Sequence, residues 1–314
     1  MKTLYKTLFI FLLTGVISCT KTVEFKGEMS APKLVINSIF STDSVFKVSV
    51  SESRFFLDDA PIETLPDANV KLYSGETLLG TFTPQNDGIF TLDGVYPEVE
   101  KNYTLKVKAS GYDNAEATAT LPRAVPIVSV DTLFNSDPYG YTEMEIKIKI
   151  NDPGNEKNYY RISCVADIYR YNEEDPNTFF YSREYVWLWS DDPVITGGEQ
   201  ESDIFGTDVY NTYNIFDDTF FNGKTYSITM GLDAWMFYDA YEESYYILNF
   251  YLENLSEDYF TYIKSRTMHE QNSDNFFAEP VPVFSNVSNG IGFFGGYSQS
   301  VHRIRIEGYI YDYQ

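Results

Sequence analysis

The sequence predicts a mainly β protein with two domains. Short segments in which apolar and polar side chains alternate recur about every ten residues, separated by Gly, Asn and Asp. The aromatic content changes along the chain, from 11 Phe, Tyr and Trp among residues 20–122 to 40 among residues 123–314. The strand spacing is typical of a β-sandwich. The change in composition indicates a second, larger domain.

The first 18 residues have the pattern of a secretory signal peptide. Lys2 and Lys6 precede a short apolar run at residues 8–13, which is too short to span a bilayer. We therefore predict that residues 1–18 are removed on export. No later segment reaches the length of about 18 apolar residues that a membrane-spanning helix needs.

The signal ends in the sequence Val16-Ile17-Ser18-Cys19, which resembles a bacterial lipobox. This resemblance implies cleavage before Cys19 and acylation of its thiol and its amine with chains such as palmitate. Several acyl chains on one residue hold a protein firmly, whereas one chain binds weakly. We expect Cys19 to be the lipidation site and residues 19–31 to be a lipidated tether.

Residues 32–124 are predicted to form the first domain, a β-sandwich. Expected strands lie at residues 33–40, 45–50, 68–73, 77–82, 89–92, 103–109 and 116–121. The segments 67–72, 88–90 and 103–107 resemble those of the small immunoglobulin-like or carboxypeptidase-regulatory-like sandwiches. Such modules lack the immunoglobulin disulfide, and this region has no Cys.

Residues 125–314 are predicted to form an aromatic-rich antiparallel β domain with one helix. Pro122 and Pro126 mark the boundary, because proline has no N–H for a sheet ladder. Ser256 is a good N-cap, followed by acidic residues in the first turn, so we expect a helix near 257–271. Expected strands lie at residues 143–150, 159–171, 185–189, 225–232, 245–253 and 301–311.

The composition excludes several classes of function. The chain has 23 Lys and Arg against 46 Asp and Glu, a formal charge of −23, so nucleic acid and anionic lipid surfaces would repel it. Two Cys and two His cannot build a disulfide framework or a zinc ribbon. Cys164 lies in a strand-like run, where we expect a buried, unreactive thiol.

Residues 290–295 match the pattern G-x-G-x-x-G, Gly-Ile-Gly-Phe-Phe-Gly. Dinucleotide binding requires a strand before this pattern and a helix opening at its last Gly. The segment that follows Gly295 is not a helix start, and the surrounding pattern is antiparallel. We therefore expect a glycine-rich strand and turn and no nucleotide ligand.

The candidate catalytic and metal-binding groups have ordinary structural interpretations. Acidic pairs are frequent in so acidic a chain, and the segment 217–224 lacks the spacing of an EF-hand loop, so we interpret it as a turn rather than a calcium site. His269 and His302 have no partner at ligand spacing; we expect His269 on a helix surface and His302 on the terminal strand. No G-x-S-x-G sequence supplies a nucleophilic Ser. We predict no catalytic residues, no metal and no cofactor.

The aromatic excess is the feature with binding potential. The candidate ligand-binding residues are Trp187, Trp189, Trp235 and Tyr238, which lie in runs more aromatic than strand alternation requires. Tyr and Trp combine a large apolar area with a polar tip, which suits sugar or protein surfaces. The alternative is that these side chains fill a β core.

Three segments carry a resemblance to a known family: residues 276–297 with their Asn-Gly and Gly-rich pattern, the predicted helix start at 255–263, and the turn at 152–160. Together with the lipobox and the sandwich, they make the chain similar to the domain of unknown function 4249 lipoproteins of Bacteroidota-type bacteria. The resemblance implies an outer-membrane lipoprotein, often encoded beside a TonB-dependent receptor. It supplies no catalytic residues.

These observations predict a lipid-anchored outer-membrane protein, on the cell-surface or the periplasmic side. We expect a binding role, as an accessory to a TonB-dependent transporter in nutrient capture or receptor docking. The alternative is a structural or adhesion lipoprotein without a small-molecule ligand. A glycoside-cleaving enzyme would need two facing carboxylates, and we predict that the protein is not an enzyme.

Overall fold

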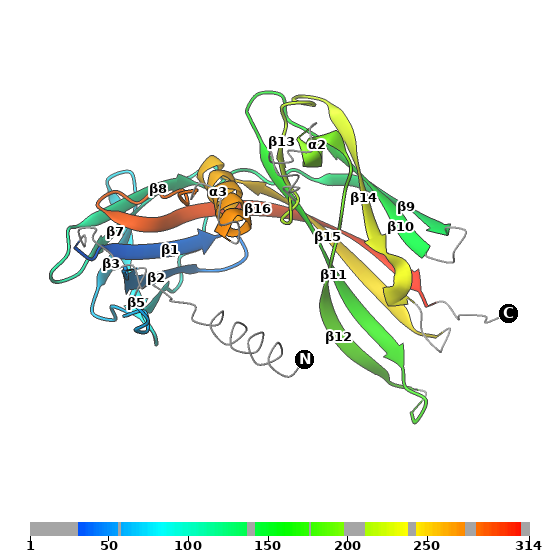
Figure 1. Ribbon diagram of the computed structural model, residues 1–314, viewed down its shortest axis with the longest axis horizontal. Coiled ribbons are helices and arrows are strands. Elements are labelled where there is room, and N and C mark those ends of the chain that lie inside the picture. Colours follow the sequence, from blue (N-terminus) through cyan, green and yellow to red (C-terminus); the bar gives the residue numbers. More distant parts are fainter. Residues whose placement is uncertain are drawn as a thin grey trace, which may run out of the picture. The chain divides into compact units, whose positions relative to one another are not determined.

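The computed structural model describes residues 31–55, 58–136, 142–175, 177–197, 211–237, 243–273 and 281–308 (Figure 1). The predicted signal peptide, Cys19, most of the tether, Tyr238 and the end of the predicted terminal strand lie outside these ranges. Residues 32–314 form one compact unit, which is described here by itself.

The first part of this unit is the predicted sandwich. One layer contains the antiparallel strands β1 (Leu34–Phe40), β2 (Phe46–Glu52), β6 (Ile89–Leu92) and β5 (Thr83–Pro84). The other layer has the order β4 (Thr77–Thr81), β3 (Asn69–Ser74), β7 (Asn102–Lys108) and β8 (Ala115–Thr120). Except for the edge strands β4 and β5, these strands alternate between buried and more exposed residues, and their buried side chains form one cluster that includes Phe40, Phe46 and Tyr103.

The second part is also two-layered. Strands β12 (Phe179–Val186), β11 (Tyr159–Tyr171) and β15 (Tyr245–Leu255) are neighbours in one sheet, with β13 (Ile215–Asp217) paired to β11. A three-stranded sheet has the order β14 (Thr225–Asp233), β10 (Thr142–Asn151) and β9 (Ile127–Ser136). Alternate residues of both sheets fill a second hydrophobic cluster. The first member of this cluster in the sequence is Val125, shortly after Leu121, which belongs to the first cluster.

Strand β16 (Gly290–Glu307) belongs to both parts. Its first residues pair in parallel with β1, and residues 297–307 pair antiparallel with β15. The result is a nine-stranded sheet with the path β12-β11-β15-β16-β1-β2-β6-β5 and β13 off the path. A mainly β fold with several antiparallel sheets is therefore confirmed.

The predicted helix near 257–271 is confirmed as α3 (Glu257–Ser273). Ser256 precedes it: its carbonyl accepts from the Phe260 N–H and its side chain from the Tyr259 N–H, while Glu257 and Asp258 complement the helix dipole. A short α2 (Pro193–Thr196) and a 3-10 turn, η1 (Ala234–Phe237), are also present. No helix within the described residues is long and apolar enough to cross a membrane.

The predicted strand at 185–189 is wrong in its position. β12 begins at Phe179 and ends at Val186, and the chain then leaves this sheet, so that Trp189 forms an isolated bridge with Gly231 of β14. The sequence does not mark the end of β12, because large strand-forming residues continue from Tyr185 through Trp189. Trp187 and Trp189 thus do not share the face of one strand.

The glycine-rich segment 290–295 is the start of β16, which confirms the predicted strand. Gly292 has φ +116°, and a Cβ there would lie 2.1 Å from the carbonyl oxygen of Ile36. Only glycine tolerates this combination of backbone conformation and close approach. The segment therefore enters a sheet, where the dinucleotide pattern would require the opening of a helix.

Candidate binding face

Strands β11, β15 and the second half of β16 have one buried face and one open face, and β12 extends their sheet at its edge. The buried face contributes Cys164, Leu248 and Phe250 to the core against β10 and β14. The opposite side of these strands is here called the outer face. Its described members, taken from the strand register, include Asp167, Tyr169 and Tyr171 of β11, Phe179, Tyr181, Arg183 and Tyr185 of β12, Tyr245, Asn249 and Tyr251 of β15, and Arg303, Arg305 and Glu307 of β16, together with the apolar Val165, Ile247 and Val301.

A row of flat groups crosses the outer face from strand to strand. The rings of Tyr181 and Tyr169 have centroids 5.2 Å apart, and those of Tyr169 and Tyr245 stack at 4.6 Å with an interplanar angle of 11°. The guanidinium of Arg305 lies 3.9 Å from the centroid of Tyr245. Cross-strand aromatic and cation–π contacts of this kind stabilise a sheet and fix the orientation of the side chains. The stacked rings thus hold the hydroxyl groups of Tyr181, Tyr169 and Tyr245 in fixed positions along one row.

Polar groups extend the outer face beside this row. Tyr181 donates its hydroxyl to Asp167 at 2.9 Å, and Arg183 lies 3.6 Å from the same carboxylate. Arg183 also donates to the hydroxyl of Tyr251 at 3.2 Å. The Asp167 carboxylate raises the pKa of both Tyr181 and Arg183. These contacts join β12, β11 and β15 across the outer face.

Asn249 connects the polar groups to β16. Its side-chain amide donates to Asp167 at 2.9 Å and to the Val165 carbonyl at 3.0 Å, and its oxygen accepts from Nε of Arg303 at 3.0 Å. Arg305 pairs with Glu307, whereas no carboxylate of the described residues forms an ion pair with Arg303. The outer face thus presents an exposed guanidinium, Arg303, that is bonded to an amide and to no described carboxylate, in a chain of net charge −23.

The other end of the same face is covered by α3. Arg161 of β11 donates from Nε to Glu253 of β15 at 2.6 Å, and its guanidinium lies 5.6 Å from the ring centroid of Tyr259 on α3. Burial raises the pKa of Glu253, and Arg161 partly offsets this shift. At this end of the outer face, α3 therefore covers the ion pair of Arg161 and Glu253. Among the described residues, the open end is the one with Tyr169, Tyr181 and Tyr245.

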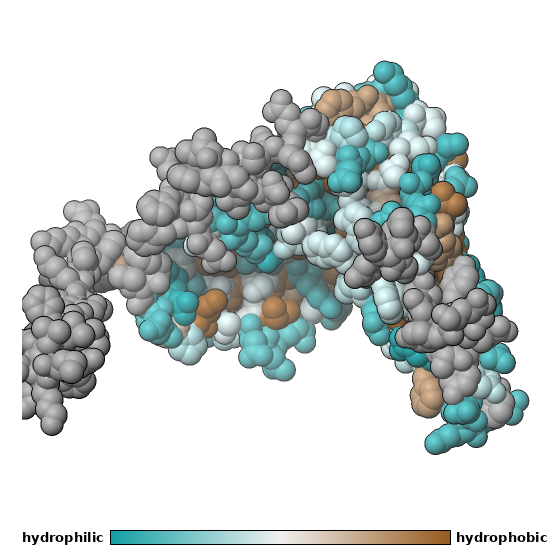
Figure 2. All heavy atoms as spheres, turned by 45° about the vertical axis from the view of Figure 1, so that its right-hand side comes forward, coloured by the Kyte–Doolittle hydropathy of each residue, from teal (hydrophilic) through white to brown (hydrophobic). Residues whose placement is uncertain are grey.

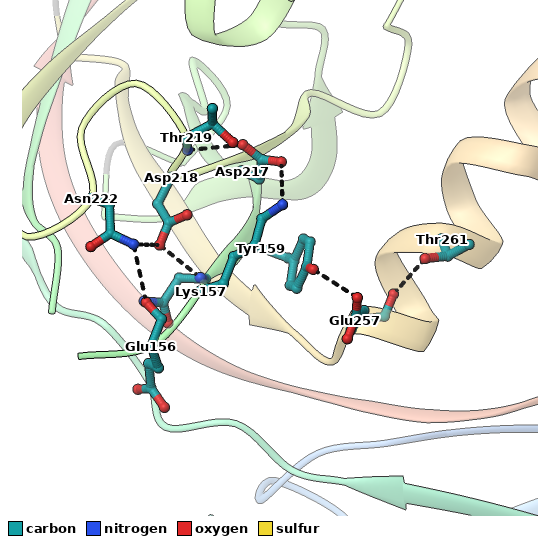
Figure 3. A network of polar contacts seen from close by, with 10 residues as sticks. Glu156, Lys157, Tyr159, Asp217, Asp218, Thr219, Asn222, Glu257 and Thr261 are labelled. Atoms are coloured by element: carbon teal, nitrogen blue, oxygen red, sulfur yellow. Dashed lines mark hydrogen bonds and ion pairs between the residues drawn. The ribbon is translucent and has the colours of Figure 1, made fainter. Parts of the chain in front are cut away.

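A second polar region lies at the start of β11 (Figure 3). The Asp218 carboxylate accepts from the Asn158 N–H at 2.8 Å and from the Asn222 amide at 3.2 Å, and burial raises its pKa. Burial would also raise the pKa of Asp217, but hydrogen bonds from Thr219 and an ion pair with Lys157 lower it. These carboxylates bind donors of the loop 217–224 itself and of residues 157 and 158 before β11.

This geometry supports the predicted turn. Among the described residues, no group of three or more His, Cys, Asp or Glu side chains is placed to hold a metal ion. Tyr159 donates to Glu257 at 3.0 Å across the same region, which ties the start of β11 to the first turn of α3 (Figure 3).

A cleft of about 530 Å³ adjoins this network. Its acidic lining consists of Glu100, Glu156, Glu257 and Asp258. Glu100 pairs with Arg123, Glu257 accepts from Tyr159, and Asp258 accepts from Asn286. The outer face is the stronger candidate for a binding site.

The predicted tryptophans lie in two segments: Trp187 and Trp189 between β12 and α2, and Trp235 in η1. Trp187 follows β12 and is 65 % exposed, Trp189 is 36 % exposed, and Trp235 in η1 is 51 % exposed. Trp189 covers Gly231, where a Cβ would lie 2.4 Å from the indole Nε1. These side chains are at the surface and are not core residues. The fourth candidate, Tyr238, lies outside the described residues.

The predictions for the titratable residues can also be compared with the structure. Cys164 is 1 % exposed, and burial raises its pKa to about 12, which confirms a buried thiol. His269 is exposed on α3 with Nδ1 2.7 Å from the Val281 carbonyl oxygen, and His302 lies on β16 opposite Phe250. Both histidines are where the sequence predicted them.

The sequence reasoning missed the outer face. Its signal is present: Tyr169, Tyr171, Tyr245 and Tyr251 occupy alternate positions that should be polar on a solvent-exposed strand face. In a chain so rich in tyrosine, we interpreted these runs simply as strands. Only the pairing register shows that Tyr169, Tyr181 and Tyr245 lie side by side.

The fold and the open face define a β-sandwich protein with an exposed aromatic and arginine surface on one sheet. The chain belongs to the family described as Domain of unknown function (DUF4249), whose model matches residues 20–303. No curated protein matches the chain.

Proposed function

We propose that the chain is a lipid-anchored binding protein of the outer membrane. In this proposal it acts as an accessory to a TonB-dependent transporter, in nutrient capture or receptor docking, and its contact surface is the outer face. The observation that carries the proposal is the open row of Tyr181, Tyr169, Tyr245 and Arg305. The proposal is non-enzymatic and includes no nucleotide, nucleic acid, metal or cofactor.

The chemistry of the outer face supports a binding role. Tyr, Trp and Arg are the residues that contribute most to binding at protein interfaces, because they bring large areas and directed hydrogen bonds. Here the rings are already stacked and Arg183 and Arg303 are already held by Tyr251 and Asn249, so little side-chain entropy is lost on contact. Hydrophilic and hydrophobic residues are interspersed over the side of the molecule seen in Figure 2, as is usual for a solvent-exposed surface with local binding patches.

The membrane anchor in this proposal rests on the sequence. The lipobox at residues 16–19 would place an acylated Cys19 ahead of a tether that reaches the first strand at Leu34. Such a tether leaves the sandwich free to approach a transporter in the same membrane.

The test is a pull-down from detergent-solubilised outer membranes with partners identified by mass. The wild-type chain is expected to capture a TonB-dependent receptor, and the double variant Tyr169→Ser/Tyr245→Ser is expected to lose it. The matched control is Val128→Ser, which changes an exposed side chain on β9 of the other sheet and should capture normally. A wild-type chain that brings down no such receptor contradicts the accessory role and favours the structural or adhesion alternative.

A further inference from the structure

Strand β12 is an edge strand with little of the usual protection. It lies at one end of the nine-stranded sheet, and among the described residues it pairs only with β11 (Figure 1). Its sequence, Phe-Phe-Tyr-Ser-Arg-Glu-Tyr-Val, contains no Pro, Gly or Lys, and its charged residues are the adjacent Arg183 and Glu184, which have opposite signs. Natural proteins protect exposed edges with such residues, with bulges or with a covering segment, because a free edge is a template for another strand.

The other strands at the ends of the described sheets show such protection. β5 has two residues, one of which is Pro84, at the opposite end of the same sheet. Trp189 bridges to the edge strand β14 at Gly231, and Ser288 bridges to the edge strand β8 at Glu116. The pairings of the edge strands β4 with β3 and β9 with β10 have register shifts. Of these described edges, β12 alone has no bridge, no register shift and no Pro.

Both faces of β12 are also accessible. Tyr181 and Tyr185 are exposed on the outer face, and Phe180, which points to the other side, is 63 % exposed. A strand added at this edge would cover aromatic surface on both sides of the sheet as well as form backbone hydrogen bonds. Burial of this surface would favour association.

The sequence of β12 is compatible with antiparallel pairing to itself. In an antiparallel pair, residues that face each other have side chains on the same side of the sheet. When two copies of one strand pair about a two-fold axis, the residue at the axis therefore faces the same residue of the other copy. An axis at Arg183 or Glu184 would place like charges opposite each other, which is destabilising. An axis at Ser182 pairs Tyr181 with the second copy's Arg183 and Phe179 with its Tyr185, using the strand from Phe179 to Tyr185.

We propose that β12 pairs antiparallel with β12 of a second copy of this chain, with the two-fold axis at Ser182. The axis is perpendicular to the sheet, so the outer faces of both copies lie on the same side. The contact of Tyr181 with the second copy's Arg183 would occur twice, once on each side of the axis. It would join the rows of aromatic and arginine side chains of the two copies. The pairing is argued from the edge and its register and does not depend on the function proposed for the outer face.

The test is disulfide trapping in the full-length chain in its own membrane. Facing residues of an antiparallel pair have Cα atoms 4.5–5.5 Å apart, within the range that a disulfide bridges. Ser182→Cys is therefore expected to give a reducible dimer on oxidation. Glu184→Cys is the matched control: its two sulfurs would be four residues apart along the strands, about 13 Å, and should not join.

Three further outcomes decide the proposal. The unsubstituted chain controls for Cys19 and the buried Cys164 and should give no cross-link. Ser182→Lys places two ammonium groups opposite each other, so it is expected to shift the wild-type dimer to a monomer in sedimentation with an unchanged circular dichroism spectrum. A monomeric wild type, equal trapping at positions 182 and 184, or trapping of the Ser182→Cys variant to a different protein overturns the pairing of two copies.

Discussion

Phe293 and Phe294 are adjacent in β16, yet they lie in different hydrophobic clusters. Phe293 stacks on Tyr262 of α3, with ring centroids 4.6 Å apart, whereas Phe294 packs on Phe40 of β1 at 4.9 Å. Strand alternation sends the two rings to opposite sides of the sheet. One short stretch of β16 thereby fixes the helix on one side and closes the first sandwich on the other.

Gly292 precedes these rings, and its replacement by Val is expected to destabilise the protein strongly. A side chain at this positive φ costs about 1–2 kcal/mol, and its Cβ would also collide with the Ile36 carbonyl. Gly111→Val is the control, since Gly111 has φ +89° but open space around its Cβ position. Urea denaturation should show Gly292→Val more destabilised by at least about 2 kcal/mol. Equal losses would mean that the close approach to β1 is unimportant.

NAD and ATP are expected to leave the Tm of the wild type unchanged, since Gly292 is needed for packing. A nucleotide-induced rise in Tm in the wild type that is absent in Gly292→Val would contradict the structural role of this segment.

Cys164 should not react with a thiol reagent in the folded protein. Burial raises its pKa to about 12, so almost no thiolate exists at pH 8. Labelling is expected only after addition of denaturant, and Cys164→Ser should cost about 1–3 kcal/mol, because a hydroxyl replaces a buried thiol. Rapid labelling of Cys164 under native conditions, followed by mass spectrometry, would show that β11 opens readily.

The buried ion pair of Arg161 and Glu253 predicts a non-additive double-mutant cycle. Arg161→Met leaves the Glu253 carboxylate without its counter-ion and is expected to cost about 3–5 kcal/mol. The double variant Arg161→Met/Glu253→Leu should recover most of that loss, because no buried charge remains. Unfolding free energies of the four proteins measure the coupling. Additive losses would indicate that water reaches this site.

The protein is expected to lose stability in alkaline solution. Burial, followed by hydrogen bonds to carboxylates, raises the pKa of Tyr159 and of Tyr226 to about 12. The folded chain therefore holds these protons more tightly than the unfolded chain, whose phenols ionise near pH 10. Their contribution is complete below pH 10 and is lost as the pH rises toward 12. Urea midpoints between pH 8 and 11.5 test this, and Tyr226→Phe should show a smaller decrease.

Cys19→Ala tests the anchor directly. Without the acylated residue, the chain is expected to remain unprocessed or to appear in the soluble fraction after cell lysis. Ser18→Ala, which keeps a small residue before the cleavage site, should be processed and membrane-bound. Correct cleavage and full membrane retention of Cys19→Ala would contradict the lipobox interpretation.

Alternation in the sequence was sufficient to predict many elements. The predicted strand at 143–150 matches β10, where Met144, Ile146 and Ile148 are buried as expected. The opposite orientations of Phe293 and Phe294 are a further consequence of strand alternation. In each case the local sequence pattern is enough to predict the strand, because one face of the strand is buried and the other is exposed to solvent.

Other features depend on information that a single segment does not contain. The glycines of β16 have no side chains to show alternation, so its continuity from Gly290 to Glu307 was not predicted. Its parallel pairing with β1 joins residues more than 250 positions apart. The outer face likewise depends on the register of four strands, and so the candidate site predicted from tryptophan runs differs from the open tyrosine row.

The position of β16 also determines when the chain can fold. The first strand and the last strand of the compact unit are hydrogen-bonded to each other, so the edge of β1 stays unpaired until residues 290–296 are available. A chain emerging from a ribosome or a translocation channel therefore cannot complete its first sandwich early, even though that sandwich is encoded first. Under the export proposed above, this order would be useful. A chain whose first sandwich is incomplete until β16 arrives stays unfolded enough to pass through a channel and completes its cooperative fold only on release.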